Sequence, residues 1–154
     1  MTKKALITGA NGFIGSRVAA ELLGAGYAVR GLLRQSSDLR SLEGLDIEKV
    51  RGDMLVPESL KPAMEGMDWV FHTAGTFRYW GEGIDRLVQQ ATQGMENVLR
   101  AAAEAGVQRV VLTSSSVSLG APTEPRAVDE DYQTTEPPEN RYVASKREQE
   151  LLAF

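Results

Sequence analysis

The sequence predicts an α/β protein with a Rossmann-like, doubly wound parallel sheet in the strand order 3-2-1-4-5. Short apolar runs alternate along the chain with longer segments in which apolar residues recur at helical spacing. A glycine-rich turn joins the first apolar run to the first helical segment. Strands that alternate with helices pair in parallel through right-handed crossovers, so we expect one domain over residues 1–154.

Each element is predicted from a local pattern. Residues 5–8 form a short apolar run that ends at a glycine, which predicts the first strand. Further strands are predicted at 27–33, 47–51, 69–71 and 109–113. Helices are predicted at 13–23 (closed by Gly24 and Gly26), at 57–65 (where Pro57 suits the first turn), at 84–105, and from 141 to the end. The polar residues 126–140 predict a loop.

The composition excludes several kinds of site. The 154 residues carry a formal net charge of −4 with no basic run, which argues against a nucleic-acid or membrane partner. The chain has no cysteine and one histidine, His72, so we expect no thiol chemistry and no metal site. No apolar run is long enough to span a membrane, and the first residues lack the pattern of a signal peptide. We therefore expect a cytoplasmic protein.

The glycine-rich turn after the first predicted strand is the strongest functional signal. Its spacing is Gly-x-x-Gly-x-x-Gly, formed by Gly9, Gly12 and Gly15. We expect Gly9 to allow a tight turn, Gly12 to let the backbone approach a pyrophosphate, and Gly15 to let the helix pack close to the strand. The N–H groups and the dipole at a helix start favour an anion. The turn therefore predicts a dinucleotide site, and a glycine-rich turn without a ligand is the alternative.

The end of the second predicted strand indicates which dinucleotide binds. An acid there holds the ribose hydroxyls of NAD, whereas an arginine accommodates the additional phosphate of NADP. Here Arg34 follows the strand, two serines come soon after it, and no acid precedes Asp38. Because a guanidinium pairs well with a phosphate, the sequence favours NADP(H) over NAD(H). The alternative is that Arg34 is an ordinary solvated arginine.

A tyrosine and a lysine four residues apart lie at the start of the last predicted helix. Tyr142 and Lys146 share one face of that helix. An ammonium group near a phenol favours the phenolate and lowers the pKa of the phenol. The phenol then becomes a usable general acid or base for carbonyl and alcohol chemistry. Taken alone, the two residues are also compatible with an ordinary exposed helical pair.

Together, these motifs resemble the extended short-chain dehydrogenase/reductase family. The resemblance is strongest to the N-terminal half of its dihydroflavonol-reductase-like and NAD-dependent epimerase/dehydratase-like members, and it covers essentially the whole chain in order. The matching segments are the glycine loop at 8–15, Gly52 with Asp53, the His-Thr-Ala-Gly run at 72–75, the serine cluster at 113–116 with Gly120, and Tyr142 with Lys146.

The resemblance implies a role for each matching residue. Ser115 would hydrogen-bond the substrate oxygen, Tyr142 would pass the proton, and Lys146 would hold the nicotinamide ribose and lower the pKa of the tyrosine. The match to the family favours Ser115 for this role only slightly over its neighbours Ser114 and Ser116. Alternatively, serines after a strand can simply cap a turn. The implied cofactor-binding residues are Gly9, Asn11, Gly12, Phe13, Ile14, Gly15, Arg34, Asp53, Met54, Thr73, Ala74, Gly75, Tyr142 and Lys146.

Two features depart from the family pattern. The long predicted helix has Ala91 where the family carries an asparagine that helps to order the active site. The chain also ends soon after Lys146, so we expect it to lack the later strands and the substrate lobe of the family. The apolar residues 110–112 would then lie at an open sheet edge, from which we expect homo-oligomers.

Two interpretations stay open for the segment after the fourth predicted strand. His72 and the aromatic run Phe77-Arg78-Tyr79-Trp80 lie at the carboxyl edge, where ligands bind in open α/β sheets. They would either form a wall that faces the substrate or nicotinamide, or fill the core.

The sequence as a whole predicts an NADP(H)-dependent oxidoreductase that transfers hydride between the nicotinamide and a small-molecule carbonyl or alcohol. One alternative is an NADP(H)-binding module without turnover, because the substrate lobe is absent. Such a module need not keep Ser115, Tyr142 and Lys146, and all three are present. The other alternative is a nucleotide-sugar epimerase, a class that tends to use NAD and that Arg34 therefore disfavours.

Overall fold

A computed structural model describes residues 2–75, 83–132 and 134–154 of the chain. Contacts divide the chain into two compact units. The first unit comprises Met1–Gly75 and Gly94–Thr113, and the second comprises Thr76–Gln93 and Ser114–Phe154. The long helix α3 (Ile84–Glu104) contributes to both units.

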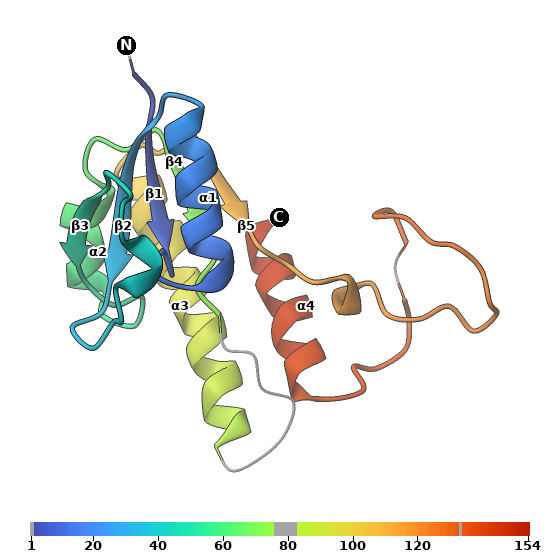
Figure 1. Cartoon of the computed structure of the whole chain (residues 1–154). Coiled ribbons are helices and arrows are strands. Elements are labelled where there is room, and N and C mark those ends of the chain that lie inside the picture. Colours follow the sequence, from blue (N-terminus) through green and yellow to red (C-terminus); the bar gives the residue numbers. More distant parts are fainter. Residues whose placement is uncertain (1, 76–82, 133) are drawn as a thin grey trace. The chain divides into compact units, whose positions relative to one another are not determined.

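The first unit contains a five-stranded parallel sheet in the order β3-β2-β1-β4-β5 (Figure 1). The strands are β1 (Lys4–Thr8), β2 (Ala28–Leu33), β3 (Glu48–Arg51), β4 (Trp69–His72) and β5 (Arg109–Leu112). The register pairs Thr8 with Leu32 on one side and with His72 on the other. The carboxyl ends of these central strands are therefore level. The predicted fold class and strand order are confirmed.

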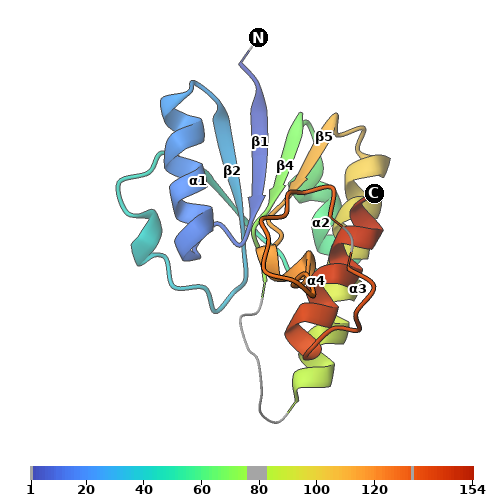
Figure 2. The same ribbon diagram turned by 90° about the vertical axis from the view of Figure 1, so that its right-hand side faces the viewer.

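Helices cover both faces of this sheet, and side chains of β1 alternate between two apolar clusters. Ile7 belongs to a cluster with Ala19 of α1 (Phe13–Gly24) and Leu42 of the short 3-10 helix η1 (Arg40–Leu42). Leu6 belongs to the other cluster, with residues of α2 (Pro57–Met64) and the second half of α3. Figure 2 shows α1 and α2 on opposite sides of the sheet. Burial on both faces explains why β1 is apolar almost throughout.

The helix ends agree with their predicted positions to within one residue, but α1 ends for a different reason than predicted. Gly24 is the last residue of α1 rather than its terminator. The chain turns at Gly26, whose φ of +82° is a left-handed conformation that other residues rarely adopt. Pro57 occupies the first turn of α2, as predicted, where its missing N–H costs no hydrogen bond.

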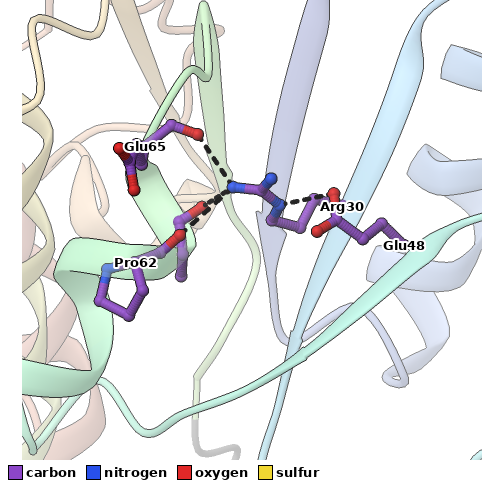
Figure 3. Close-up of polar contacts among 5 residues, drawn as sticks. Arg30, Glu48, Pro62 and Glu65 are labelled. Carbon is purple, nitrogen blue, oxygen red and sulfur yellow. Dashed lines mark hydrogen bonds and ion pairs between the residues drawn. The ribbon is translucent and has the colours of Figure 1, made fainter.

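An arginine in β2 stabilises the carboxyl end of α2 (Figure 3). The Arg30 guanidinium donates Nη1 hydrogen bonds to the carbonyl oxygens of Pro62 (3.4 Å), Ala63 (2.9 Å) and Glu65 (3.0 Å). Its Nε pairs with Glu48 of β3 at 2.8 Å. The last carbonyl groups of a helix have no partner within the helix and carry partial negative charge. Arg30 therefore satisfies them and ties α2 to the sheet.

β5 is an edge strand of the sheet. Its central residue Val111 is 37% exposed, and the other apolar residues of the strand are half-buried. Among the residues that the structure describes, no helix is both long and apolar enough to cross a lipid bilayer.

The second unit contains the first part of α3, the 3-10 helix η2 (Ser116–Ser118) and α4 (Arg141–Ala153). Asn140 caps α4, since its Oδ1 accepts a hydrogen bond from the Val143 N–H at 3.1 Å. Within this unit α4 is joined to α3, because the Gln149 amide donates to the Ala91 carbonyl oxygen at 3.1 Å and the Thr92 hydroxyl to the Glu148 carboxylate at 3.0 Å.

Candidate functional site

The glycine loop makes a tight turn at the carboxyl end of β1. Gly9 has a φ of +71°, a conformation that suits glycine, and its carbonyl oxygen accepts a hydrogen bond from the Gly12 N–H at 2.9 Å. Gly12 is the N-cap residue of α1 and has no side chain to cap the helix. Figure 2 shows the start of α1 close to the end of β1. The first N–H groups of α1 and its dipole are thus placed to attract an anion.

Close approach of backbone explains why Gly9 and Gly15 are glycine. A Cβ atom on Gly15 would lie 2.2 Å from the Gly9 carbonyl oxygen and 2.8 Å from the Thr73 Oγ1. A Cβ atom on Gly9 would lie 2.8 Å from the backbone N and Cα of Ala74. Side chains at these two positions would fill the space that lets the helix start, the loop and residues 73–74 pack together. This cradle has the features that a pyrophosphate-binding loop requires.

Threonine side chains join the loop to the end of β4. The Thr73 hydroxyl donates to the Thr8 carbonyl oxygen at 2.8 Å and lies 3.4 Å from the Gly9 carbonyl oxygen. The Thr8 hydroxyl lies 2.7 Å from His72 Nδ1 and accepts a 3.4 Å hydrogen bond from the Ala74 N–H. These bonds fix the loop against the neighbouring strand in the geometry that the glycines allow.

His72 is fully buried, with no exposed surface. The interpretation of His72 as a wall facing the substrate is therefore wrong, because the imidazole lies inside the protein and bonds to Thr8. Residues Phe77-Arg78-Tyr79-Trp80 lie outside the described residues, so that part of the expectation stays a prediction.

The Asp53–Met54 segment after β3 is held by two residues of α3. The Asn97 side chain donates to the Met54 carbonyl oxygen at 2.9 Å, and a Cβ atom on Gly94 would lie 2.7 Å from the Met54 sulfur. Asp53 is half-buried, and its Oδ1 accepts a hydrogen bond from the Leu55 N–H at 2.9 Å. Gly94 and Asn97 thus position the segment whose acid is expected to contact adenine.

Two apolar side chains at the start of α1 are exposed, Phe13 by 83% and Ile14 by 48%. Asn11 is half-buried, and its carbonyl oxygen accepts a 2.7 Å hydrogen bond from the Ser41 hydroxyl of η1. The rim of the glycine loop is therefore apolar on the helix side and is fixed from the other side by η1.

Arg34 comes directly after β2 and is exposed. The first acid after it, Asp38, is engaged by Arg40, which donates its backbone N–H at 3.0 Å and its Nε at 2.8 Å. The side-chain hydrogen bond from Arg40 is the main reason why the pKa of Asp38 lies below its ordinary value. The Arg34 carbonyl oxygen also accepts a 2.7 Å hydrogen bond from Arg51 of β3, a residue that the sequence analysis did not single out.

In the second unit, Ser115 lies at the start of η2 and is half-buried. Its carbonyl oxygen accepts hydrogen bonds from the Ser118 N–H at 2.9 Å and the Ser118 hydroxyl at 2.7 Å. The main chain at Ser115 is therefore fixed, while its hydroxyl group is not used by these bonds.

Tyr142 and Lys146 lie one turn apart on α4, as their spacing predicts. Tyr142 is 8% exposed and Lys146 is half-buried. Burial lowers the pKa of Lys146 below its ordinary value, and the carboxylate of Glu150 acts in the opposite direction. The phenol and the ammonium group are therefore carried on the same face of α4.

Arg147 joins the serine segment to α4, a role that the sequence did not reveal. Its guanidinium donates to the carbonyl oxygens of Ser118 at 3.1 Å and Glu136 at 2.7 Å. A Cβ atom on Gly120 would lie 2.9 Å from the same guanidinium. Arg147 thereby holds η2, and with it Ser115, against the helix that carries the tyrosine.

The expected site residues fall into the two units by role. Those implied for cofactor binding lie at the carboxyl ends of β1, β2, β3 and β4 in the first unit, apart from Tyr142 and Lys146. The three implied for catalysis lie in the second unit, around η2 and α4: Ser115, Tyr142 and Lys146.

Comparisons with known proteins identify the family of the chain. The model of the NAD dependent epimerase/dehydratase family matches residues 5–154. The chain is 36% identical to a putative dihydroflavonol 4-reductase from Synechocystis sp., over 83% of this chain and 37% of that protein. It is 40% identical to cinnamoyl-CoA reductase 1 from Oryza sativa subsp. japonica, over 96% of this chain and 46% of that protein.

A solved structure shares the same fold. A short-chain dehydrogenase/reductase superfamily protein from Agrobacterium tumefaciens, crystallised with bound NAD, superposes with a TM-score of 0.80 at 31% identity. The match covers 97% of this chain and 43% of that one. The chain therefore belongs to the NAD-dependent epimerase/dehydratase family of short-chain dehydrogenases/reductases, as the sequence motifs indicated. It spans less than half the length of these relatives.

Proposed function

We propose that this chain is the cofactor-binding part of an NADP(H)-dependent oxidoreductase that acts on a carbonyl or alcohol. The observation that carries the proposal is the cradle formed by Gly9, Gly15 and residues 73–74, in which added Cβ atoms would meet backbone at 2.2–2.8 Å. A structure that excludes side chains here, beside the bare start of a helix, suits a pyrophosphate. A dinucleotide held there would supply the hydride donor or acceptor.

The preference for NADP(H) over NAD(H) is proposed on the charges near Arg34. A cation follows β2 where NAD-binding sites carry an acid, and the first acid after it in the sequence, Asp38, is already bound to Arg40. The relative from Agrobacterium tumefaciens contains NAD, so cofactor choice in this family has to be tested chain by chain.

The proposed chemistry assigns one task to each of three residues. In the direction of reduction, the Tyr142 hydroxyl would give its proton to the carbonyl oxygen of the substrate, which becomes the oxygen of an alcohol. The Ser115 hydroxyl hydrogen-bonds that oxygen, and the Lys146 ammonium favours the phenolate that Tyr142 becomes. Alcohol oxidation runs through the same groups in reverse.

A reduction assay with a Tyr142→Phe variant tests the catalytic part of this proposal. NADPH consumption is followed with a panel of small aldehydes and ketones and, separately, with the thioester cinnamoyl-CoA, since one relative is named a cinnamoyl-CoA reductase. Loss of the general acid lowers such rates by about 10²–10⁴-fold. Activity that survives in Tyr142→Phe would refute the mechanism, whereas tight NADPH binding without turnover on any compound would favour the binding module.

We also propose a domain organisation, a location and an assembly state for the chain. The 154 residues are proposed to act as one dinucleotide-binding domain in the cytoplasm, with no nucleic-acid or membrane partner. Homo-oligomers are proposed to form through the β5 edge, which the exposed Val111 supports. The epimerase alternative is consistent with the family that the chain belongs to, and Arg34 is the feature that disfavours it.

A further inference from the structure

The turn after β2, which begins at Arg34, is bonded to an arginine at the end of β3. The Ser37 N–H donates to the Arg34 carbonyl oxygen at 3.0 Å and closes the turn. The same oxygen accepts the Arg51 Nη1 hydrogen bond at 2.7 Å. Arg51 is the last residue of β3 and pairs in register with Leu33, the residue before Arg34. The sheet therefore fixes Arg51 beside Arg34, at the carboxyl edge.

The residues around this turn carry an excess of positive charge. Asp38 is paired with Arg40, so its negative charge is compensated locally. Within the described parts of the chain, no carboxylate lies at ion-pair distance from Arg34 or Arg51. Both arginines are exposed. One cationic side chain directly after β2 and another at the end of the adjacent strand β3 are charges that would attract a phosphate monoester.

We propose that Arg51 is a second specificity-determining residue for the 2′-phosphate of NADP(H), an inference that rests on the proposed preference for that cofactor. One Nη1 hydrogen bond holds the Arg34 carbonyl and so fixes the turn that carries Arg34. A guanidinium has five N–H donors, and the remaining ones are available for a phosphate oxygen. Arg51 thus has two roles: its hydrogen bond fixes the turn, and its positive charge attracts the phosphate.

Substitutions of Arg51 can distinguish the contribution of its hydrogen bond to the Arg34 carbonyl oxygen from that of its positive charge. Arg51→Gln keeps a neutral N–H donor on a shorter side chain but removes the charge. Arg51→Lys keeps the charge but loses the planar set of donors. Lys49→Met is the matched control, because Lys49 is an exposed cation on the same strand and the same face, two residues farther from the carboxyl edge.

The experiment measures the Kd of NADP+ and of NAD+ for the 154-residue chain and these variants by calorimetry. We expect Arg51→Gln to weaken NADP+ about tenfold and NAD+ by less than about twofold, with Arg51→Lys in between and Lys49→Met near the wild type. Circular dichroism confirms that each variant is folded.

The outcomes distinguish a failure of the proposed NADP(H) preference from a failure of the role proposed for Arg51. A wild type that does not prefer NADP+ would contradict the proposed function itself. A wild type that prefers NADP+, combined with an Arg51→Gln variant whose preference is unchanged, would overturn the role of Arg51 alone. An equal loss for both cofactors in Arg51→Gln, or an equal loss of preference in Lys49→Met, would also overturn it.

Discussion

Replacement of Gly15 by alanine is expected to destroy the cofactor cradle while α1 stays folded. The new Cβ atom would lie 2.2 Å from the Gly9 carbonyl oxygen and 2.9 Å from the Ala10 Cα, both backbone atoms that cannot rotate away. Carbon atoms in proteins make favourable contacts at about 3.5–4.0 Å. The loop or the helix start must therefore move to accommodate one methyl group.

The size of the effect follows from opposing contributions. Alanine is a better helix former than glycine by about 0.5–1 kcal/mol, whereas overpacking at a site without space costs about 1–3 kcal/mol. Displacement of the loop also moves the N–H groups that are expected to face the pyrophosphate. Since a tenfold change in Kd corresponds to about 1.4 kcal/mol, we expect the Kd of NADP+ to rise about tenfold or more in Gly15→Ala.

Gly24 provides the matched control in the same helix. A Cβ atom on Gly24 would meet nothing within 4 Å, and its φ is not positive. Gly24→Ala is therefore expected to raise the free energy of unfolding by about 0.5 kcal/mol and to leave the Kd unchanged. Calorimetric titration and urea denaturation of both variants provide the comparison. Unaltered NADP+ affinity in Gly15→Ala would refute the role given to this packing.

Two further predictions concern stability. Arg30→Met removes the charged hydrogen bonds to the last turn of α2, and we expect it to lower the free energy of unfolding, measured in urea, by about 2–3 kcal/mol. Glu48→Gln removes only the ion pair and should lower it by less than about 1 kcal/mol. Similar losses of stability in the two variants would contradict this prediction. The folded chain binds the proton of Lys146 less tightly than the unfolded chain, because burial lowers its pKa. The stability of the wild type relative to Lys146→Met should therefore rise as the pH approaches 10.5, and a fall would show that the cause is misassigned.

The sequence was sufficient to predict the sheet because both of its faces are buried. Strands such as β1 are then continuous apolar runs between polar turns, and such runs can be recognised without knowledge of what packs on them. The glycine loop was predictable for a related reason, since a left-handed φ at Gly9 and a missing side chain at Gly15 are requirements of one residue type.

The contacts that support the site were not predicted, because they depend on the register of the strand pairs and on the side-chain conformations as well as on the strand order. Arg51 lies beside Arg34 only because β3 pairs with β2, and the register could have suggested it once the strand order was known. The burial of His72 and its bond to Thr8 likewise depend on the pairing of β4 with β1. Arg147 contacts carbonyl groups of an irregular segment, for which the sequence carries no periodic signal.

Cofactor titration of the unmodified chain measures the proposed preference for NADP(H) itself. The affinities of NADP+ and NAD+ are measured side by side at one salt concentration, together with an Arg34→Met variant. The glycine cradle and the arginines at the end of β2 and β3 predict that NADP+ binds about tenfold more tightly than NAD+, and that Arg34→Met removes most of this difference. Equal or tighter binding of NAD+ by the wild type would contradict the account.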